Sequence, residues 1–102
     1  MIHVLAMITT KPGKREEVLA AFRAIVPAVR KEDGCIEYGA AVDAEGVGSA
    51  QTKLGPDTYA VVEKWASPAA LAAHSTAAHM AQYRAKTKDL VVSRVIHVLS
   101  PT

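Results

Sequence analysis

The chain has 102 residues, of which 50% are hydrophobic and 22% are charged, and its formal net charge at pH 7 is +2. This length and composition predict one small, ordinary soluble globular domain. The nearly neutral charge, without any run of lysine or arginine, argues against a protein that binds nucleic acid or an acidic membrane surface. No apolar run approaches the roughly 18 residues that a membrane-spanning helix needs.

The beginning of the sequence and its single cysteine bear on the cellular compartment. MIHVLAMITT is apolar, but it lacks a basic start and KPGKREE follows it, so we expect no secretory signal peptide. Cys35 has no second cysteine with which to form an internal disulfide. We therefore expect a cytoplasmic protein.

A strand followed by a helix is predicted at the start of the chain. Residues 2–10 are β-branched and apolar, and the breaker KPG follows them, which is typical of a strand. Residues 14–31 carry one apolar stripe at helical spacing: Val18, Phe22, Ile25 and Val29. Pro27 lies inside this pattern, so we expect a kink or a break near residues 25–26.

Two strands separated by a long loop are predicted next. The turn residues Asp33-Gly34 end the helix, and residues 35–43 then form the second strand. Residues 44–57 are rich in glycine and small polar side chains, as expected for a loop. Residues 58–66 form the third strand, in which large apolar positions alternate with others.

A second helix and a fourth strand complete the predicted elements. Ser67 is a good N-cap and Pro68 a good first helical residue. The helix should continue to about Lys86, and residues 75–76 are where an interruption could fall. The fourth strand is predicted over residues 90–99.

The order βαββαβ predicts an α+β, ferredoxin-like antiparallel sheet with both helices on one face. Both faces of the first and the last strand in the sequence are apolar. The first strand carries Ile2, Val4, Ala6 and Ile8 on one face and Leu5 and Met7 on the other. The last strand carries Leu90, Val92, Ile96 and Val98 opposite Val91, Val95 and Leu99. A bare apolar face of this size is unusual on a soluble monomer, so we predict a homodimer whose two sheets pack into a shared barrel.

Several segments resemble a known family over essentially the whole length of the chain. DGCIEYGAAVD, YAVVEKWASPAALAAHSTAAHM and VIHVL resemble the antibiotic biosynthesis monooxygenase family. IVPAVRKEDGC, GPDTYAVVEKW, HMAQY and VLSP are most similar to the bacterial quinol monooxygenases within it. The resemblance implies one domain over residues 1–102 and a dimeric α+β barrel. It also implies oxidation of quinols or polycyclic phenols by molecular oxygen, without flavin, haem or metal.

The residues themselves offer little for a cofactor or a metal. The Gly46-Val47-Gly48 segment lies in a loop between two strands, which is the wrong context for a dinucleotide site. On a continuous helix His74 and His79 would lie roughly 140° apart, so they should not share a metal ion. His3 and His97 lack an evident carboxylate partner. We therefore expect no cofactor and no metal site.

A reaction with oxygen then needs a substrate that supplies the electrons, and a quinol does so readily once it is deprotonated. Histidine suits proton removal near neutral pH, and aromatic walls suit the binding of a flat ring. The candidate catalytic residues are His74 and Trp65. The candidate substrate-binding residues are Tyr38, Tyr59, His79 and Tyr83. Each of these residues has an ordinary alternative role in core packing.

Glu63 alternates with Trp65 along the third strand and would be a buried carboxylate if that face packs against the helices. A buried carboxylate needs a partner, and the candidates are Arg94 and the backbone around Lys64.

Two other functions remain as alternatives. The first is a dimeric protein that binds a small aromatic molecule without catalysis. The second is haem degradation, which by resemblance uses an asparagine on the first strand and a tryptophan and a histidine on the second helix. The chain contains no asparagine and has Leu5, His74 and Arg84 at those positions, which argues against haem degradation.

Overall fold

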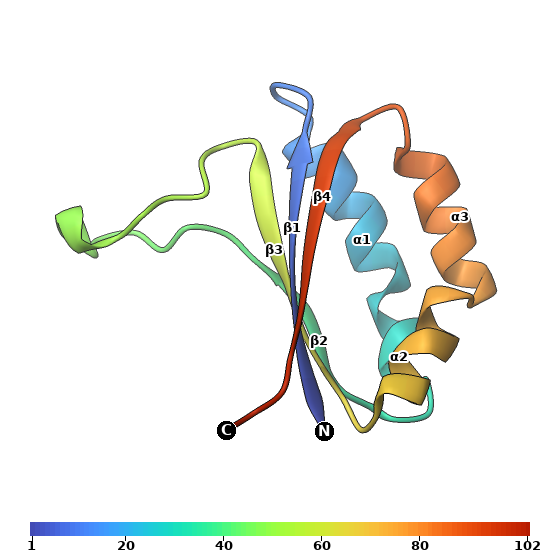
Figure 1. Cartoon of the computed structure of the whole chain (residues 1–102). Coiled ribbons are helices and arrows are strands. Elements are labelled where there is room, and N and C mark those ends of the chain that lie inside the picture. Colours follow the sequence, from blue (N-terminus) through green and yellow to red (C-terminus); the bar gives the residue numbers. More distant parts are fainter.

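The computed structural model describes residues 1–102 and contains one four-stranded sheet. The elements in chain order are β1 (Ile2–Thr10), α1 (Arg15–Arg30), β2 (Cys35–Ala41), the short 3-10 helix η1 (Gly48–Ala50), β3 (Thr58–Trp65), α2 (Pro68–Ser75), α3 (Ala78–Thr87) and β4 (Val91–Leu99). The strands are antiparallel in the order β2-β3-β1-β4. Figure 1 shows the helices α1, α2 and α3 on one face of the sheet, whereas only the short η1, at the end of the projecting loop between β2 and β3, lies toward the other side. The predicted ferredoxin-like α+β fold is therefore confirmed.

The register of the central strand β1 places alternate residues of three strands in one row on the helix-covered face. Val4 lies opposite Glu63 of β3 and Val98 of β4, and Ala6 lies opposite Val61 and Ile96. In β3 burial alternates along the strand, so Tyr59, Val61, Glu63 and Trp65 are the buried residues. The predicted placement of Glu63 and Trp65 on one face of β3 is therefore confirmed.

Helix α1 continues unbroken through Pro27 to Arg30, so the expected break near residues 25–26 is wrong. Proline removes one backbone N–H, but only the last turn of the helix follows it. Contacts beyond the proline hold that turn: Val29 is fully buried, and Nε of Arg30 donates a hydrogen bond to the carbonyl oxygen of Tyr38 at 3.1 Å.

Strand β2 ends at Ala41, two residues before the predicted end at Asp43. The carboxylate of Asp43 accepts hydrogen bonds from the backbone N–H groups of Leu54 and Gly55, at 2.8 and 2.9 Å. These bonds lower the pKa of Asp43 and fix the base of the loop between β2 and β3. In Figure 1 this loop reaches away from the sheet on the side opposite the helices.

The second helix of the predicted pattern is two helices. Oγ of Ser67 accepts the N–H of Ala70 at 3.2 Å and Pro68 opens α2, as predicted. Helix α2 ends at Ser75, and Ala77 adopts an extended backbone conformation before α3 begins at the next residue. The direction of the chain therefore changes between His74 and the residues of α3.

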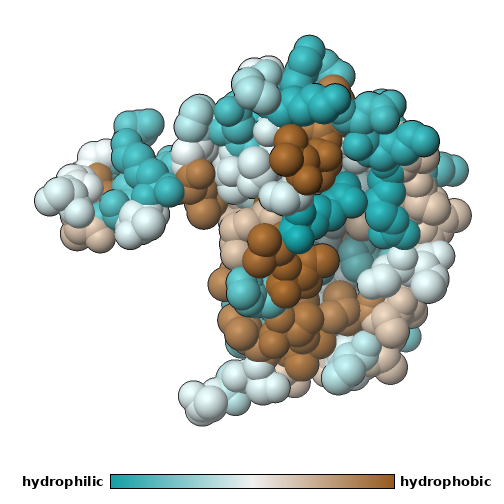
Figure 2. All heavy atoms as spheres, turned by 45° about the horizontal axis from the view of Figure 1, so that its top comes forward, coloured by the Kyte–Doolittle hydropathy of each residue, from teal (hydrophilic) through white to brown (hydrophobic).

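The face of the sheet without helices, together with the edge strand β4, exposes large apolar side chains. Leu5 is 37% exposed, Val95 48% and Leu99 44%. In Figure 2 apolar side chains gather in a continuous area beside the projecting loop. No helix is long and apolar enough to cross a bilayer.

Candidate functional site

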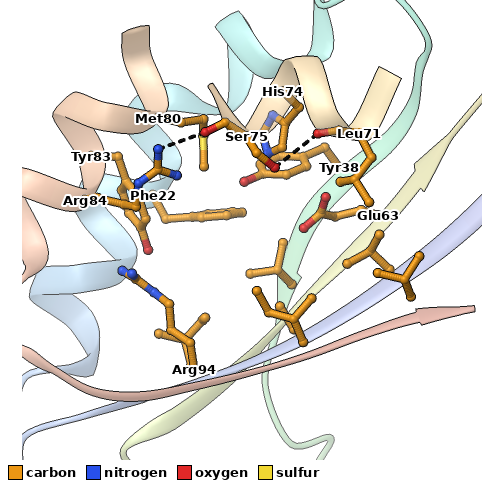
Figure 3. A pocket seen from close by; sticks show the side chains of 16 residues that line it. Phe22, Tyr38, Glu63, Leu71, His74, Ser75, Met80, Tyr83, Arg84 and Arg94 are labelled. Atoms are coloured by element: carbon orange, nitrogen blue, oxygen red, sulfur yellow. Dashed lines mark hydrogen bonds between the residues drawn. The ribbon is translucent and has the colours of Figure 1, made fainter. Parts of the chain in front are cut away.

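A cavity of about 380 Å³ lies between the helices and the row of strand residues described above. Its walls are mostly apolar. The sheet contributes Val4, Ala6, Ile8, Val61, Ile96 and Val98, and the helices contribute Phe22, Leu71 and Met80. The polar or aromatic lining residues are Tyr38, Glu63, His74, Ser75, Tyr83, Arg84 and Arg94 (Figure 3). This size and lining are typical of a site for a small organic molecule.

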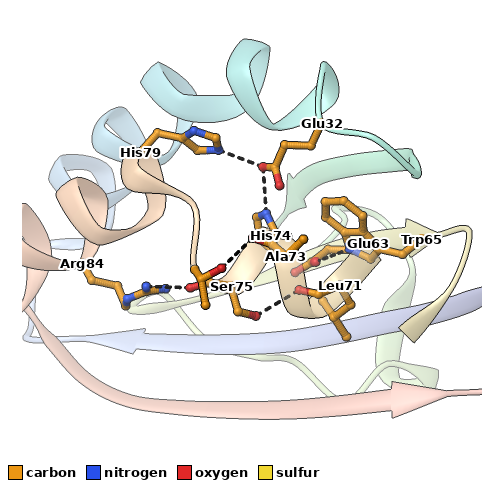
Figure 4. Close-up of polar contacts among 10 residues, drawn as sticks. Glu32, Glu63, Trp65, Leu71, Ala73, His74, Ser75, His79 and Arg84 are labelled. Carbon is orange, nitrogen blue, oxygen red and sulfur yellow. Dashed lines mark hydrogen bonds and ion pairs between the residues drawn. The ribbon is translucent and has the colours of Figure 1, made fainter. Parts of the chain in front are cut away.

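His74 comes from α2 and is only 4% exposed. Its imidazole lies between two aromatic rings, with ring centroids 4.6 Å from Trp65 and 5.3 Å from Tyr38. Nδ1 of His74 donates a hydrogen bond to Oε2 of Glu32 at 2.9 Å, which fixes the plane of the ring (Figure 4). His74 is therefore held rigidly at the wall of the cavity.

His79 reaches the same carboxylate oxygen. Nε2 of His79 lies 2.8 Å from Oε2 of Glu32, outside the cavity lining. The expectation that His74 and His79 lie roughly 140° apart, and so should not share a metal ion, assumed a continuous helix. That expected separation is wrong because the chain turns between α2 and α3. The two imidazoles converge on Glu32 (Figure 4).

This arrangement determines where the imidazole protons lie. An ionised carboxylate only accepts hydrogen bonds, so Nδ1 of His74 and Nε2 of His79 each carry a hydrogen. The side chain of His74 makes one hydrogen bond, through Nδ1. In the neutral form of His74 the other ring nitrogen, Nε2, therefore has a free lone pair.

Glu63 is a buried carboxylate whose partner is Trp65. Nε1 of Trp65 donates to Oε1 of Glu63 at 2.8 Å, so the suggested Arg94 partner is wrong. Burial raises the pKa of Glu63, while the hydrogen bond from Trp65 and the nearby His74 act in the opposite direction. Trp65 is fully buried and does not line the cavity. It contacts two residues that do, through its hydrogen bond to Glu63 and its ring contact with His74.

The three tyrosines divide between the cavity and the core. Tyr38 and Tyr83 line the cavity, whereas Tyr59 is fully buried and its hydroxyl lies 2.7 Å from that of Tyr83. Burial raises the pKa of Tyr38 and of Tyr59, so both hydroxyls stay protonated near neutral pH. They can donate hydrogen bonds but cannot act as bases there.

Glu32, His74 and His79 also offer the kinds of atom that bind a divalent metal, all within 4.8 Å of one another. Metal binding would require both nitrogens that face Glu32 to lose their hydrogens. The contact distances of 2.8 and 2.9 Å suit N–H···O hydrogen bonds. The cluster is complete as a hydrogen-bonded unit, and the expectation of a metal-free protein stays a prediction.

Several polar residues of the site, among them Glu32, Arg84 and Arg94, were not among the candidates. Glu32 lies 42 residues from His74, and no sequence spacing indicates their contact. Arg84 and Arg94 lie at the side of the cavity opposite Glu63 (Figure 3). Arg94 did carry a signal, because it interrupts the apolar row that Ile96 and Val98 continue on β4.

The fold and site together define a small α+β domain that holds an apolar cavity between its helices and an antiparallel sheet. The chain belongs to the antibiotic biosynthesis monooxygenase family, whose model matches residues 1–86. It is 40% identical over 103 aligned residues to the Escherichia coli protein named "Probable quinol monooxygenase YgiN". That alignment covers 99% of this chain and 98% of the relative.

Solved structures share the fold over nearly the whole chain. The crystal structure of PA3566 from Pseudomonas aeruginosa has a TM-score of 0.81 and 25% identity, covering 99% of this chain and 93% of that one. The structure of Rv0793 from Mycobacterium tuberculosis has a TM-score of 0.80 and 26% identity, covering 99% and 94%.

Proposed function

We propose that this protein is a cofactor-independent monooxygenase that oxidises a quinol or a polycyclic phenol with molecular oxygen. The observation that carries the proposal is the Glu32–His74 pair at the wall of an apolar cavity, 2.9 Å apart. Family membership and the name of the Escherichia coli relative support the same reaction class.

The proposed reaction needs no electron source other than the substrate. A quinol has two electrons to lose on becoming a quinone, and insertion of one oxygen atom into a ring C–H bond removes two more. These four electrons reduce one molecule of oxygen to the new hydroxyl group and one molecule of water. The protein's task is to ionise the quinol, since the anion donates electrons far more readily than the neutral form.

Named residues supply that step. Nε2 of His74 accepts the hydroxyl proton, and the carboxylate of Glu32 stabilises the imidazolium through Nδ1–H. Trp65 and Tyr38 hold the imidazole between them, which keeps its geometry fixed during proton transfer. The apolar walls exclude water and favour a flat ring.

The alternative is a protein that binds an aromatic molecule without oxidising it. The contacts of His74 with Glu32, Trp65 and Tyr38 would hold its ring equally well in a protein that only binds the aromatic molecule. Oxygen uptake with a reduced naphthoquinone distinguishes the two functions: an oxygenase consumes oxygen faster than the uncatalysed solution reaction, and a simple binding protein does not.

We also propose that the protein is a homodimer in which a second copy covers the face of the sheet without helices. The exposed apolar side chains of Leu5, Val95 and Leu99 on that face support this arrangement. A twofold axis would place equivalent patches against each other.

A further inference from the structure

Two arginines lie at one side of the cavity and come from different elements. Arg84 belongs to α3 and Arg94 to β4, and both line the cavity, with Tyr83 between them in Figure 3. Glu63 and Leu71 lie at the other side. The tertiary fold therefore brings two positive charges together at one end of an apolar chamber.

Neither guanidinium has a carboxylate partner in the chain. The ion pairs are Arg23–Glu16, Lys64–Glu37 and the contacts of Glu32 with His74 and His79. Nη2 of Arg84 donates to the carbonyl oxygen of Ser75 at 2.9 Å, and the guanidinium of Arg94 lies 5.9 Å from the ring centroid of Tyr83. These contacts hold the side chains in place without neutralising their charges, and most of their N–H donors stay available.

The cavity is thus polarised along its length. The two guanidiniums lie at one end, and the Glu63 carboxyl group and His74 lie toward the other. An anionic group would be attracted to the arginines and repelled by Glu63, whereas a hydroxyl group would find its proton acceptor in His74. Arginine binds carboxylates through paired, charge-assisted hydrogen bonds.

We propose that the cavity selects an aromatic hydroxyl compound that carries a carboxylate on the opposite side of its ring system. Arg84 and Arg94 bind the carboxylate, and the hydroxyl group points toward His74. A volume of about 380 Å³ suits a molecule of this kind. This inference rests on the proposed function for the role of His74. The preference for a carboxylate, in contrast, is a difference in affinity, so it can be measured without any oxidation.

The test compares stable naphthalenes that differ in charge, without any oxidation. Affinities for 6-hydroxy-2-naphthoate, its methyl ester and 2-naphthol are measured by isothermal titration calorimetry at pH 7. We expect the carboxylate to bind at least about tenfold more tightly than the ester, which is the effect of one favourable charged interaction. We also expect this preference to decrease as salt is raised from 50 to 300 mM.

Variants identify the source of the preference. Arg84→Gln with Arg94→Gln should remove the tenfold advantage of the carboxylate, and each single variant should remove part of it. Arg23→Gln is the matched control, because it changes the net charge equally at a residue that is outside this cavity and paired with Glu16. Affinity for 2-naphthol should stay nearly constant in all of these variants, which shows that they remain folded.

Equal affinity for carboxylate and ester, failure of the carboxylate to bind, or an unchanged preference in the double variant would each overturn the inference. The same protein is then tested for oxygen uptake with reduced menadione. Oxygen uptake without charge preference would leave the oxygenase function standing and remove the anion site. Charge preference without oxygen uptake, either with reduced menadione or with a naphthoquinol that carries a carboxylate, would leave the anion site standing and remove the oxygenase function.

Discussion

Nδ1 of His74 and Oε2 of Glu32 are 2.9 Å apart, although 42 residues separate them in the sequence. The contact joins the turn after α1 to α2 and sets both the plane and the proton position of the imidazole. If His74 is the base, Glu32 is the residue that positions it and that stabilises its protonated form.

Replacement Glu32→Gln keeps a hydrogen-bond acceptor near His74 but removes the negative charge. We expect turnover of a reduced naphthoquinone to fall by about tenfold or more, because the imidazolium loses its counter-ion. The acid limb of the pH–rate profile should also move, which a purely structural role would not cause. His79→Gln is the control. His79 contacts the same oxygen of Glu32 from outside the cavity, so the turnover of this variant should fall less than that of Glu32→Gln. An unchanged pH profile in Glu32→Gln would contradict the positioning role.

Replacement His74→Ala removes the proposed base itself. Loss of a general base typically lowers a rate by about 10² to 10⁴, and we expect turnover to fall by that order. The loss should shrink at high pH, where the quinol ionises without help. The measurement is oxygen uptake against pH, after the variant has been shown to have the parent's fold and assembly. Full activity of a folded His74→Ala protein across the pH range would exclude His74 as base and make His79 the next candidate, followed by solvent.

Replacement Trp65→Phe keeps an aromatic ring but removes the N–H donor to Glu63. A hydrogen bond to a charged group contributes roughly 1.5 to 3 kcal/mol, so the free energy of unfolding should fall by about 2 kcal/mol. KM should rise more than kcat falls, because His74 keeps its hydrogen bond to Glu32 and can still accept the proton. Denaturant unfolding and the separate changes in kcat and KM check this. A large loss of kcat with unchanged stability would show that Trp65 has a direct catalytic role.

Replacement Val95→Asp places a charge on the apolar face that a second copy is proposed to cover. An unpaired charge buried in that interface should cost several kcal/mol and shift the protein toward monomer. Val47→Asp is the control, because Val47 is similarly exposed but lies in the loop between β2 and β3. Analytical ultracentrifugation measures both variants against the parent. A parent protein that sediments as a stable folded monomer would contradict the barrel.

The purified protein should show no visible flavin or haem absorbance and no stoichiometric metal. Glu32, His74 and His79 make the metal measurement informative, since they are the residues that could bind an ion. Elemental analysis and oxygen uptake after dialysis against a chelator test this expectation. Stoichiometric metal, with uptake lost on chelation and restored by the ion, would contradict cofactor-free catalysis while leaving the fold unaffected.

The fold could be predicted from the sequence because its signals are local. Apolar spacing in α1, alternation in β3 and the Ser67-Pro68 start of α2 each indicate one element, and their order permits few arrangements. The unbroken helix at Pro27 was harder to predict, because the contacts of the last turn, such as that of Arg30 with Tyr38, are tertiary.

The site was only partly predictable, because several of its contacts join residues that are far apart in the sequence. His74 and Tyr38 could be chosen by residue type and position, and both line the cavity. The interruption expected near residues 75–76 does occur, because α2 ends at Ser75 and α3 begins at Ala78. The new direction of α3, which brings His79 to Glu32, depends on tertiary contacts and had no local signal.

The most direct test of the proposed oxygenase is anaerobic mixing of the protein with reduced menadione, followed by admission of ¹⁸O₂ and mass analysis of the product. The account predicts uptake well above the rate of the solution alone, with one ¹⁸O atom in a hydroxylated quinone and the other in water. Uptake no faster than in protein-free solution, or a product quinone without ¹⁸O, would contradict it.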